Sequence, residues 1–220
     1  LRALTDQYPD TMMVGEIGDE SGMAMVAQYS SPSAEGAERL HMGYCFDLLA
    51  DRHDAPYLHG VIAKFERVAA EAGGGWACWA LSNHDCQRLA TRWGGDHPDP
   101  ALLRLAPALQ LSLRGAVCLY QGEELGLPEA DIAFEDLQDP YGITMWPEFK
   151  GRDGCRTPMP WQALDGQGGF SPVEPWLPVS AAQRALAVDV QEADPDSTLH
   201  AARALLAWRR KSPVIRAGDL

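Results

Sequence analysis

The feature that most constrains the fold is the alternation of short apolar runs with segments of helical pattern. Four runs are almost continuously apolar, at residues 12–17, 41–49, 76–81 and 115–120. Apolar residues recur at helical spacing from Val61 to Ala72, and helical pattern follows again over residues 101–114. Apolar strands joined by helical crossovers predict a parallel sheet covered by helices. In such sheets the chemistry lies beyond the carboxyl ends of the strands.

Further helices are expected toward the end of the chain. Helical pattern returns at residues 181–190 and again over Thr198–Lys211, where Asp196 or Ser197 is expected to be the cap. Within the earlier helix at 101–114, Pro107 is expected to introduce a kink or to delay the start. With these helices the chain has an α/β pattern. Its length allows one or two domains.

Composition argues against two classes of partner. The 220 residues carry a formal net charge of −13 and no extended basic cluster, so we expect no nucleic-acid partner. No run of about 18 apolar residues occurs, so we expect no membrane span. The five cysteines form no CxxC pair, which argues against a zinc site, and their use fits a reducing compartment. We therefore expect a cytoplasmic protein with no metal site in this chain.

Two carboxyl groups follow apolar runs. Glu16 stands at the end of the first run, and Asp85 follows the third run directly after His84. A pair of carboxyl groups is the minimum requirement for glycoside hydrolysis. Burial among apolar neighbours would raise the pKa of Glu16 toward neutrality, as a general acid requires. Taken singly, each residue has a simpler explanation, as a solvated loop glutamate and as a helix cap.

The segment after the fourth run is polar, rich in proline and glycine, and contains three tryptophans that argue against disorder. At its start, Glu123 and Glu124 are expected to satisfy backbone groups, because two glutamates buried together cannot both stay charged. Farther along, Arg152 and Arg156 lie in a turn shaped by proline and glycine. A guanidinium fork binds carboxylates bidentately, so one arginine could anchor an active-site aspartate. Surface solubility is the simpler alternative.

Together these motifs resemble the α-amylase family, glycoside hydrolase family 13. The resemblance rests on four segments in order, residues 14–17 (VGEI), 81–85 (LSNHD), 120–126 (YQGEELG) and 151–161 (GRDGCRTPMPW). The last of these segments resembles the α-glucosidase and oligo-1,6-glucosidase branch more than the endo-acting amylases. The resemblance covers nearly the whole chain.

The resemblance implies a role for each matched residue. Glu16 matches the general acid/base, and Asp85 matches the carboxylate that stabilises the transition state and binds glucose hydroxyls. His84 matches the neighbouring histidine of the same subsite. Arg152 matches the arginine that contacts the terminal glucose and a pocket aspartate, and Arg156 is assigned as a supporting arginine.

The family fold is a (β/α)8 TIM barrel followed by a β-sandwich, and the four strands here are expected to be strands five to eight. Residues 1–210 then form the C-terminal half of the catalytic barrel, with a long active-site loop at about 121–179. Residues 211–220 begin the link toward a β-sandwich. The nucleophile and a domain that can carry structural calcium are expected in a missing N-terminal half, which becomes a required partner.

The resemblance implies a retaining, exo-acting α-glucosidase that hydrolyses or transfers terminal α-linked glucose from short oligosaccharides or sucrose-like donors. No cofactor is expected. Because no nucleophile is recognisable in the chain, these residues alone are expected to be inactive. The alternative is a non-catalytic relative that serves as a binding module or a transporter partner.

Overall fold

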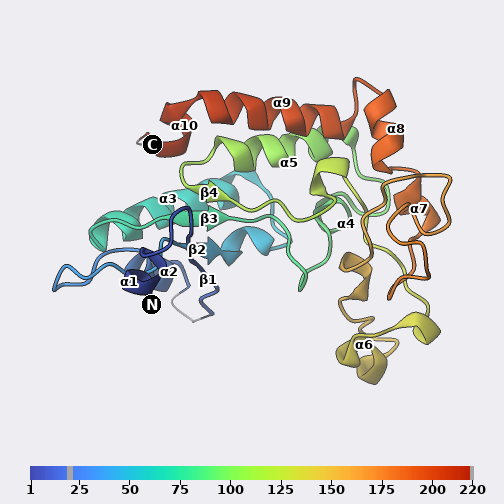
Figure 1. The fold of residues 1–220 in the computed structure, drawn as a ribbon, viewed down its shortest axis with the longest axis horizontal. Helices are drawn as coiled ribbons and strands as arrows, with labels where there is room; N and C mark the ends of the chain where they lie inside the picture. The colour runs from blue at the N-terminus through green and yellow to red at the C-terminus, as the bar shows by residue number, and fades with distance from the viewer. Residues whose placement is uncertain (19–21, 219–220) are drawn as a thin grey trace. The chain divides into compact units, whose positions relative to one another are not determined.

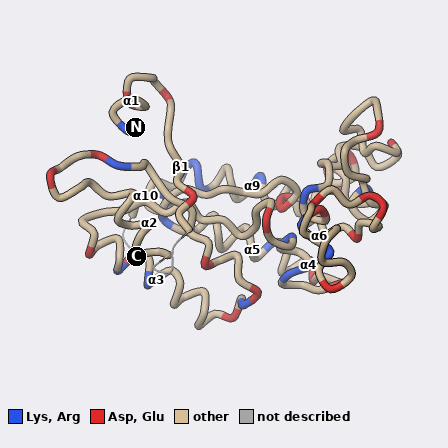
Figure 2. Tube along the Cα trace, turned by 90° about the horizontal axis from the view of Figure 1, so that it is seen from below, with Lys and Arg blue, Asp and Glu red and all other residues tan. Residues whose placement is uncertain are grey.

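The computed structural model describes residues 1–18 and 22–218, and the chain divides into two compact units. The first unit comprises Leu1–Leu81, Gln110–Cys118 and Arg209–Leu220, and the second comprises Ser82–Leu109 and Leu119–Trp208. Figure 1 follows the chain by colour. Lys and Arg are dispersed along the trace among more numerous Asp and Glu (Figure 2), in keeping with the net charge of −13.

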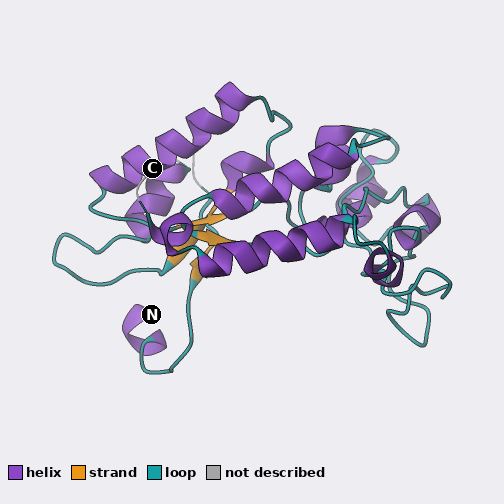
Figure 3. Cartoon of the chain, turned by 90° about the horizontal axis from the view of Figure 1, so that it is seen from above, coloured by secondary structure: helices purple, strands orange, loops and turns teal. Residues whose placement is uncertain are grey.

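The first unit is built on a four-stranded parallel sheet. Its strands are β1 (Val14–Gly15), β2 (Met42–Cys45), β3 (Ala77–Trp79) and β4 (Ala116–Val117), and they lie side by side in sequence order. Each neighbouring pair is parallel, which confirms the predicted sheet. The strands are shorter than the apolar runs that predicted them and lie among longer helices (Figure 3). The second run, for example, leaves the sheet after Cys45 and continues as a 3₁₀ helix, Phe46–Leu49.

Within its described residues, the first unit also contains four complete helices, of which the second along the chain packs on the sheet and on the third. They are α1 (Arg2–Thr5), α2 (Met23–Tyr29), α3 (Ala55–Glu71) and α10 (Pro213–Ala217). α3 buries Val61, Phe65, Val68 and Ala69, the apolar positions that predicted it. The sequence interpretation did not include α2, whose seven residues are too few for a clear helical period; α2 packs on both α3 and β2.

The core of this unit centres on Trp79, which has no exposed surface. Its ring meets the ring of Phe65 edge to face at 5.4 Å between centroids. Its indole Nε1 donates a hydrogen bond of 2.7 Å to the carbonyl of Arg114. The buried amide of Gln110 donates to the carbonyls of Trp79 and Cys118 at 2.9 and 3.0 Å. These bonds satisfy the carbonyl of the last residue of β3 and carbonyls on either side of β4.

Two helices, α5 (Pro100–Ser112) and α9 (Thr198–Lys211), run from the second unit into the first. α5 continues through Pro107, so the expected late start is wrong. α9 has the predicted bounds, and the hydroxyl of Ser197 accepts a hydrogen bond of 3.3 Å from the amide of His200, so Ser197 is the cap.

The second unit contains short helices joined by long loops. They are α4 (Leu89–Gly94), α6 (Pro140–Met145), α7 (Ala181–Arg184) and α8 (Val188–Ala193), with 3₁₀ helices at Glu123–Leu125, Phe134–Asp136 and Asp153–Cys155. The single helix predicted over residues 181–190 is wrong. The backbone amide of Val188 donates to the carbonyl of Pro160 at 3.1 Å instead of bonding within a helix. A loop distant in sequence therefore divides this segment into α7 and α8.

Two expectations from composition can be compared with the structure. Among the described residues, no helix combines the length and the hydropathy that crossing a bilayer requires. All five cysteines are free thiols. Burial raises the pKa of the Cys78 and Cys155 thiols to about 12, which makes them small buried apolar groups rather than reactive ones.

Candidate active site

Glu16 follows β1 at the carboxyl edge of the parallel sheet, as predicted. The preceding Gly15 lies close to the Leu40 side chain, since a Cβ at this position would be 2.4 Å from its Cδ1. The side chain of Glu16 is exposed, so the described residues do not supply the apolar enclosure that the sequence interpretation expected. Burial is lacking because β1 is an edge strand with β2 as its one neighbour among the described strands.

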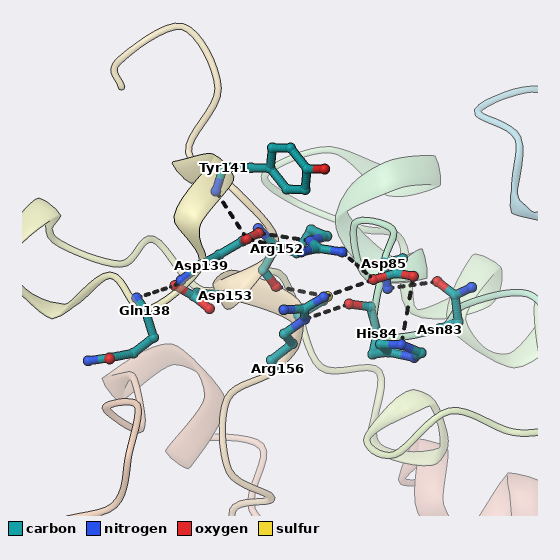
Figure 4. Close-up of polar contacts among 10 residues, drawn as sticks. Asn83, His84, Asp85, Gln138, Asp139, Tyr141, Arg152, Asp153 and Arg156 are labelled. Atoms are coloured by element: carbon teal, nitrogen blue, oxygen red, sulfur yellow. Dashed lines mark hydrogen bonds and ion pairs between the residues drawn. The ribbon is translucent and has the colours of Figure 1, made fainter. Parts of the chain in front are cut away.

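Asp85 lies in a tight turn of the second unit (Figure 4). Its backbone amide donates a hydrogen bond of 2.9 Å to the side-chain oxygen of Asn83. The buried hydroxyl of Ser82 accepts the amide of Leu89 at 3.1 Å. α4 has no side-chain cap, so the alternative that Asp85 caps a helix is wrong. The turn directs the carboxylate toward two arginines instead.

Both arginines of the predicted turn bind Asp85. Arg152 Nη1 and Arg156 Nη2 each donate to the same oxygen, Oδ1, at 2.8 Å. The other oxygen, Oδ2, lies 3.7 Å from Nε2 of His84, beyond hydrogen-bond distance. Arg156 also donates from Nε to the carbonyl of His84 at 2.7 Å. The structure thus brings four of the five predicted site residues together, with both arginines on Oδ1 of Asp85 and His84 nearest its Oδ2.

A carboxylate that the sequence interpretation missed anchors Arg152. Asp139 has no exposed side-chain surface, and its two oxygens accept from Arg152 Nε at 2.8 Å and Nη2 at 3.0 Å. These hydrogen bonds hold the pKa of the Asp139 carboxyl far below its usual range and raise the pKa of Arg152. The ring of Tyr141 lies 5.2 Å from the guanidinium, a cation–π contact.

Asp139 is in turn held by the backbone around it. Its Oδ2 accepts the amide of Arg152 at 2.9 Å, and its Oδ1 accepts the amide of Tyr141 at 3.2 Å. Asp153, which is fully buried, accepts the amides of Gln138 and Asp139 at 2.6 and 2.8 Å. An Asp before a Pro is a sequence signal for a helix cap. That signal could have located Asp139, but it does not indicate an arginine partner.

Buried polar side chains support the turn that carries Asp85. Arg88 is 2% exposed; its Nη1 donates to the carbonyl of Gln121 at 2.7 Å, and its amide donates to Glu129 at 2.7 Å. Glu123 accepts the amide of Tyr120 at 2.9 Å, and Glu124 accepts that of Gly122 at the same distance. The prediction that these glutamates satisfy backbone groups is confirmed. Burial raises the pKa of Glu123 to about 7.

A cavity of about 560 Å³ lies beside Asp85 and Arg152, and all of its lining residues belong to the second unit. The lining combines polar residues, such as Gln87, Thr91 and Glu129, with apolar ones, such as Ile132 and Phe149. This volume is within the range of small-molecule sites. Among the described residues, no group of three or more His, Cys, Asp or Glu side chains is arranged to hold a metal ion.

Parallel strands in sequence order, helices over them and a polar cluster in the turn after β3 define part of a (β/α) barrel. The chain belongs to the α-amylase family, because the model of the alpha amylase catalytic domain matches residues 1–218. It is 48% identical over 222 residues to a probable alpha-glucosidase of Rhizobium meliloti (strain 1021), with 100% of this chain and 39% of that protein covered.

Two further relatives agree with this placement. The crystal structure of an alpha-glucosyl transfer enzyme, XgtA, superimposes with a TM-score of 0.90 at 53% identity, covering 99% of this chain and 39% of XgtA. An oligo-1,6-glucosidase of Parageobacillus thermoglucosidasius is 30% identical over 163 residues, covering 65% of this chain and 29% of that enzyme. The chain therefore spans about two fifths of the length of the first two of these relatives.

Proposed function

We propose that the chain supplies the general acid/base and the glucose-binding residues of a retaining, exo-acting α-glucosidase. The observation that carries the proposal is the Asp85 cluster, in which two arginines fix one carboxylate oxygen and leave the other to a ligand, in a chain of the α-amylase family. The relatives at about half identity are named as a probable alpha-glucosidase and an alpha-glucosyl transfer enzyme, which supports this branch.

In the proposed mechanism Glu16 protonates the oxygen of the leaving group. It then acts as a base that takes a proton from the incoming water or sugar hydroxyl. Its position directly after a parallel strand supports this role, because barrel chemistry is carried by residues at the carboxyl ends of strands.

Asp85 is proposed to bind two hydroxyls of the terminal glucose and to stabilise the positive charge that develops on the ring. Its free oxygen, Oδ2, is the acceptor for this contact. His84 and Arg152 would donate to other hydroxyls of the same glucose, and Arg156 would hold Asp85 in place. The side chain of Asp85 is 40% exposed, so a substrate can reach it.

Retention requires a nucleophile about 5 Å from the acid/base. We propose that this nucleophile belongs to a complementary part of a longer protein and that the four strands here are strands five to eight. This proposal is supported by the chain's coverage of about two fifths of the length of its first relatives. It is also supported by the sheet edges at β1 and β4, each of which pairs with one strand among those described. Residues 211–220 would lead toward a further domain.

Water as the final acceptor gives hydrolysis, and a sugar or alcohol gives glucosyl transfer. Short α-glucosides or sucrose-like molecules are the proposed donors. An assay of the purified 220-residue chain with maltose and p-nitrophenyl α-glucoside tests whether the site is divided between this chain and another part of the protein. We expect no turnover from the chain alone and turnover from the full-length protein that contains it. Clear activity of the isolated 220 residues would disprove the missing-nucleophile proposal.

A further inference from the structure

The guanidinium of Arg152 is divided between two carboxylates. Nε and Nη2 bind Asp139, and Nη1 binds Asp85. We propose that Asp139 is a positioning residue for glucose binding: it fixes the plane of the Arg152 guanidinium so that Nη1 alone is presented to Asp85 and the sugar. This inference rests on the proposed function of Asp85 and Arg152.

The geometry of the guanidinium carries the first step. Its five N–H groups point outward in one rigid plane, so two bonds to one carboxylate fix the direction of all the others. Asp139 forms this side-on pair at 2.8 and 3.0 Å. With one N–H each of Nε and Nη2 bound to Asp139, Arg152 reaches Asp85 through Nη1, at 2.8 Å.

The rigidity of Asp139 carries the second step. Its side chain has no exposed surface, whereas the Asp85 side chain is 40% exposed. Its oxygens accept the amides of Tyr141 and Arg152, and its own amide is held by the buried Asp153. A carboxylate fixed by backbone groups is a firm reference point, and the guanidinium takes its orientation from this one rather than from the exposed turn.

Charge balance carries the third step. Arg152 and Arg156 both donate to Oδ1 of Asp85, so two positive groups face one carboxylate. Asp139 balances one of these charges. Without it, Arg152 could turn its Nε and Nη2 edge toward Asp85, and the carboxylate would be occupied by the arginines. The oxygen proposed to bind glucose hydroxyls would then be less available.

The chain contains a matched control for this arrangement. Asp54 caps α3 by accepting the amide of Tyr57 at 3.0 Å and receives the same side-on pair from Arg52, at 3.1 Å from Nε and 3.2 Å from Nη2. The guanidinium of Arg52 likewise lies over the ring of Tyr57, at 4.8 Å from its centroid. Among the described residues, Arg52 has no ion pair with a second carboxylate. Asp54 thus combines the cap and the fork without an onward link.

The test compares D139N, D54N, R152A and the double variant D139N/R152A in the full-length protein. The measured quantities are the inhibition constant of D-glucose, the KM for maltose, kcat and the thermal midpoint. Since a lost charge-assisted hydrogen bond weakens binding by about 10- to 100-fold, we expect D139N to raise the glucose inhibition constant at least about tenfold. D54N should leave this constant unchanged, and because the Asp54 side chain is 48% exposed and asparagine caps helices as well as aspartate does, it should change the thermal midpoint little.

The double variant separates positioning from general stability. If Asp139 acts through Arg152, D139N has no further effect on glucose binding once Arg152 is alanine. Additive effects on the glucose constant overturn the inference, and so does a D139N protein with normal glucose binding and only a lower thermal midpoint. Should D139N fail to fold, R152K, which removes the fork and retains Asp139, must reproduce the expected weakening. Normal glucose binding in R152A would instead contradict the proposed function.

Discussion

At the scale of single residues, the charged groups of the second unit fall into two kinds. Asp85, Arg152 and Arg156 are partly exposed and joined by ion pairs with one oxygen in common. Arg88 and Glu123 lie deeper, and each bonds to backbone rather than to an opposite charge. The first kind is accessible from solvent, whereas the second holds the loops in place.

A pH dependence of stability follows from Glu123. Burial raises the pKa of its carboxyl from 4.5 to about 7. Between these values the folded protein keeps a proton that the unfolded chain releases, so stability falls as the pH rises and the full loss is reached above pH 7. E123Q removes this loss. Relative to the parent, we expect E123Q to gain up to about 3 kcal/mol between pH 4.5 and pH 8.

Thermal midpoints of both proteins across this pH range measure the difference. E124Q, which alters the neighbouring carboxyl, is the control: because the charge of Glu124 contributes to the raised pKa of Glu123, E124Q should show a somewhat smaller loss than the parent but not the flat profile of E123Q. A constant offset between E123Q and the parent over the whole range would show that Glu123 is not protonated preferentially in the folded state.

At the scale of elements, segments distant in sequence are joined by arginine bonds to backbone carbonyls. Arg88 links the segment after β3 to the loop that follows β4, through Gln121. Arg209, at the end of α9, donates to the carbonyls of Leu111 and Leu113 at 2.7 Å each. Such bonds satisfy carbonyls where regular structure ends, and an arginine can do this at several points because it carries five donors.

The Arg88 link can be tested against an exposed counterpart. R88K leaves the carbonyl of Gln121 without its partner in a buried setting, so we expect a loss of about 2 kcal/mol in stability. Arg104 makes a similar bond of 2.6 Å to the carbonyl of Asp196, but at the surface, and R104K should change stability by less than about 0.5 kcal/mol. Urea unfolding of both variants measures these changes. Equal losses would contradict the role of burial.

Whether an element could be predicted from the sequence depends on how far apart in the chain its interacting residues lie. The four strands were predictable because buried parallel strands are apolar along their whole length. The break between α7 and α8 was not, because it depends on a bond from Val188 to Pro160. Arg152 was identified as a carboxylate partner from its residue type, but Asp139 was missed, since their pairing depends on how the loop folds.

At the scale of the whole molecule, chemistry and fold point to a site that this chain forms in part. The chain contributes four parallel strands, the glutamate after β1 that we propose as the acid/base and the Asp85 cluster that we propose to bind glucose, and it spans about two fifths of the length of its first relatives. The proposed roles of Glu16 and of the nucleophile can be told apart by experiment. Removing Glu16 and removing the nucleophile are expected to give different products.

The central claim is that Glu16 is the acid/base of a retaining site, and azide rescue of E16A in the full-length protein tests it most directly. E16A should form the glucosyl intermediate from p-nitrophenyl α-glucoside, because p-nitrophenol leaves with little protonation, but it should lack the base that activates water. We expect a loss of about 100- to 10,000-fold with maltose. Azide, which needs no base, should restore turnover of the nitrophenyl substrate and yield α-glucosyl azide. Formation of β-glucosyl azide, or full activity of E16A without azide, would contradict this account.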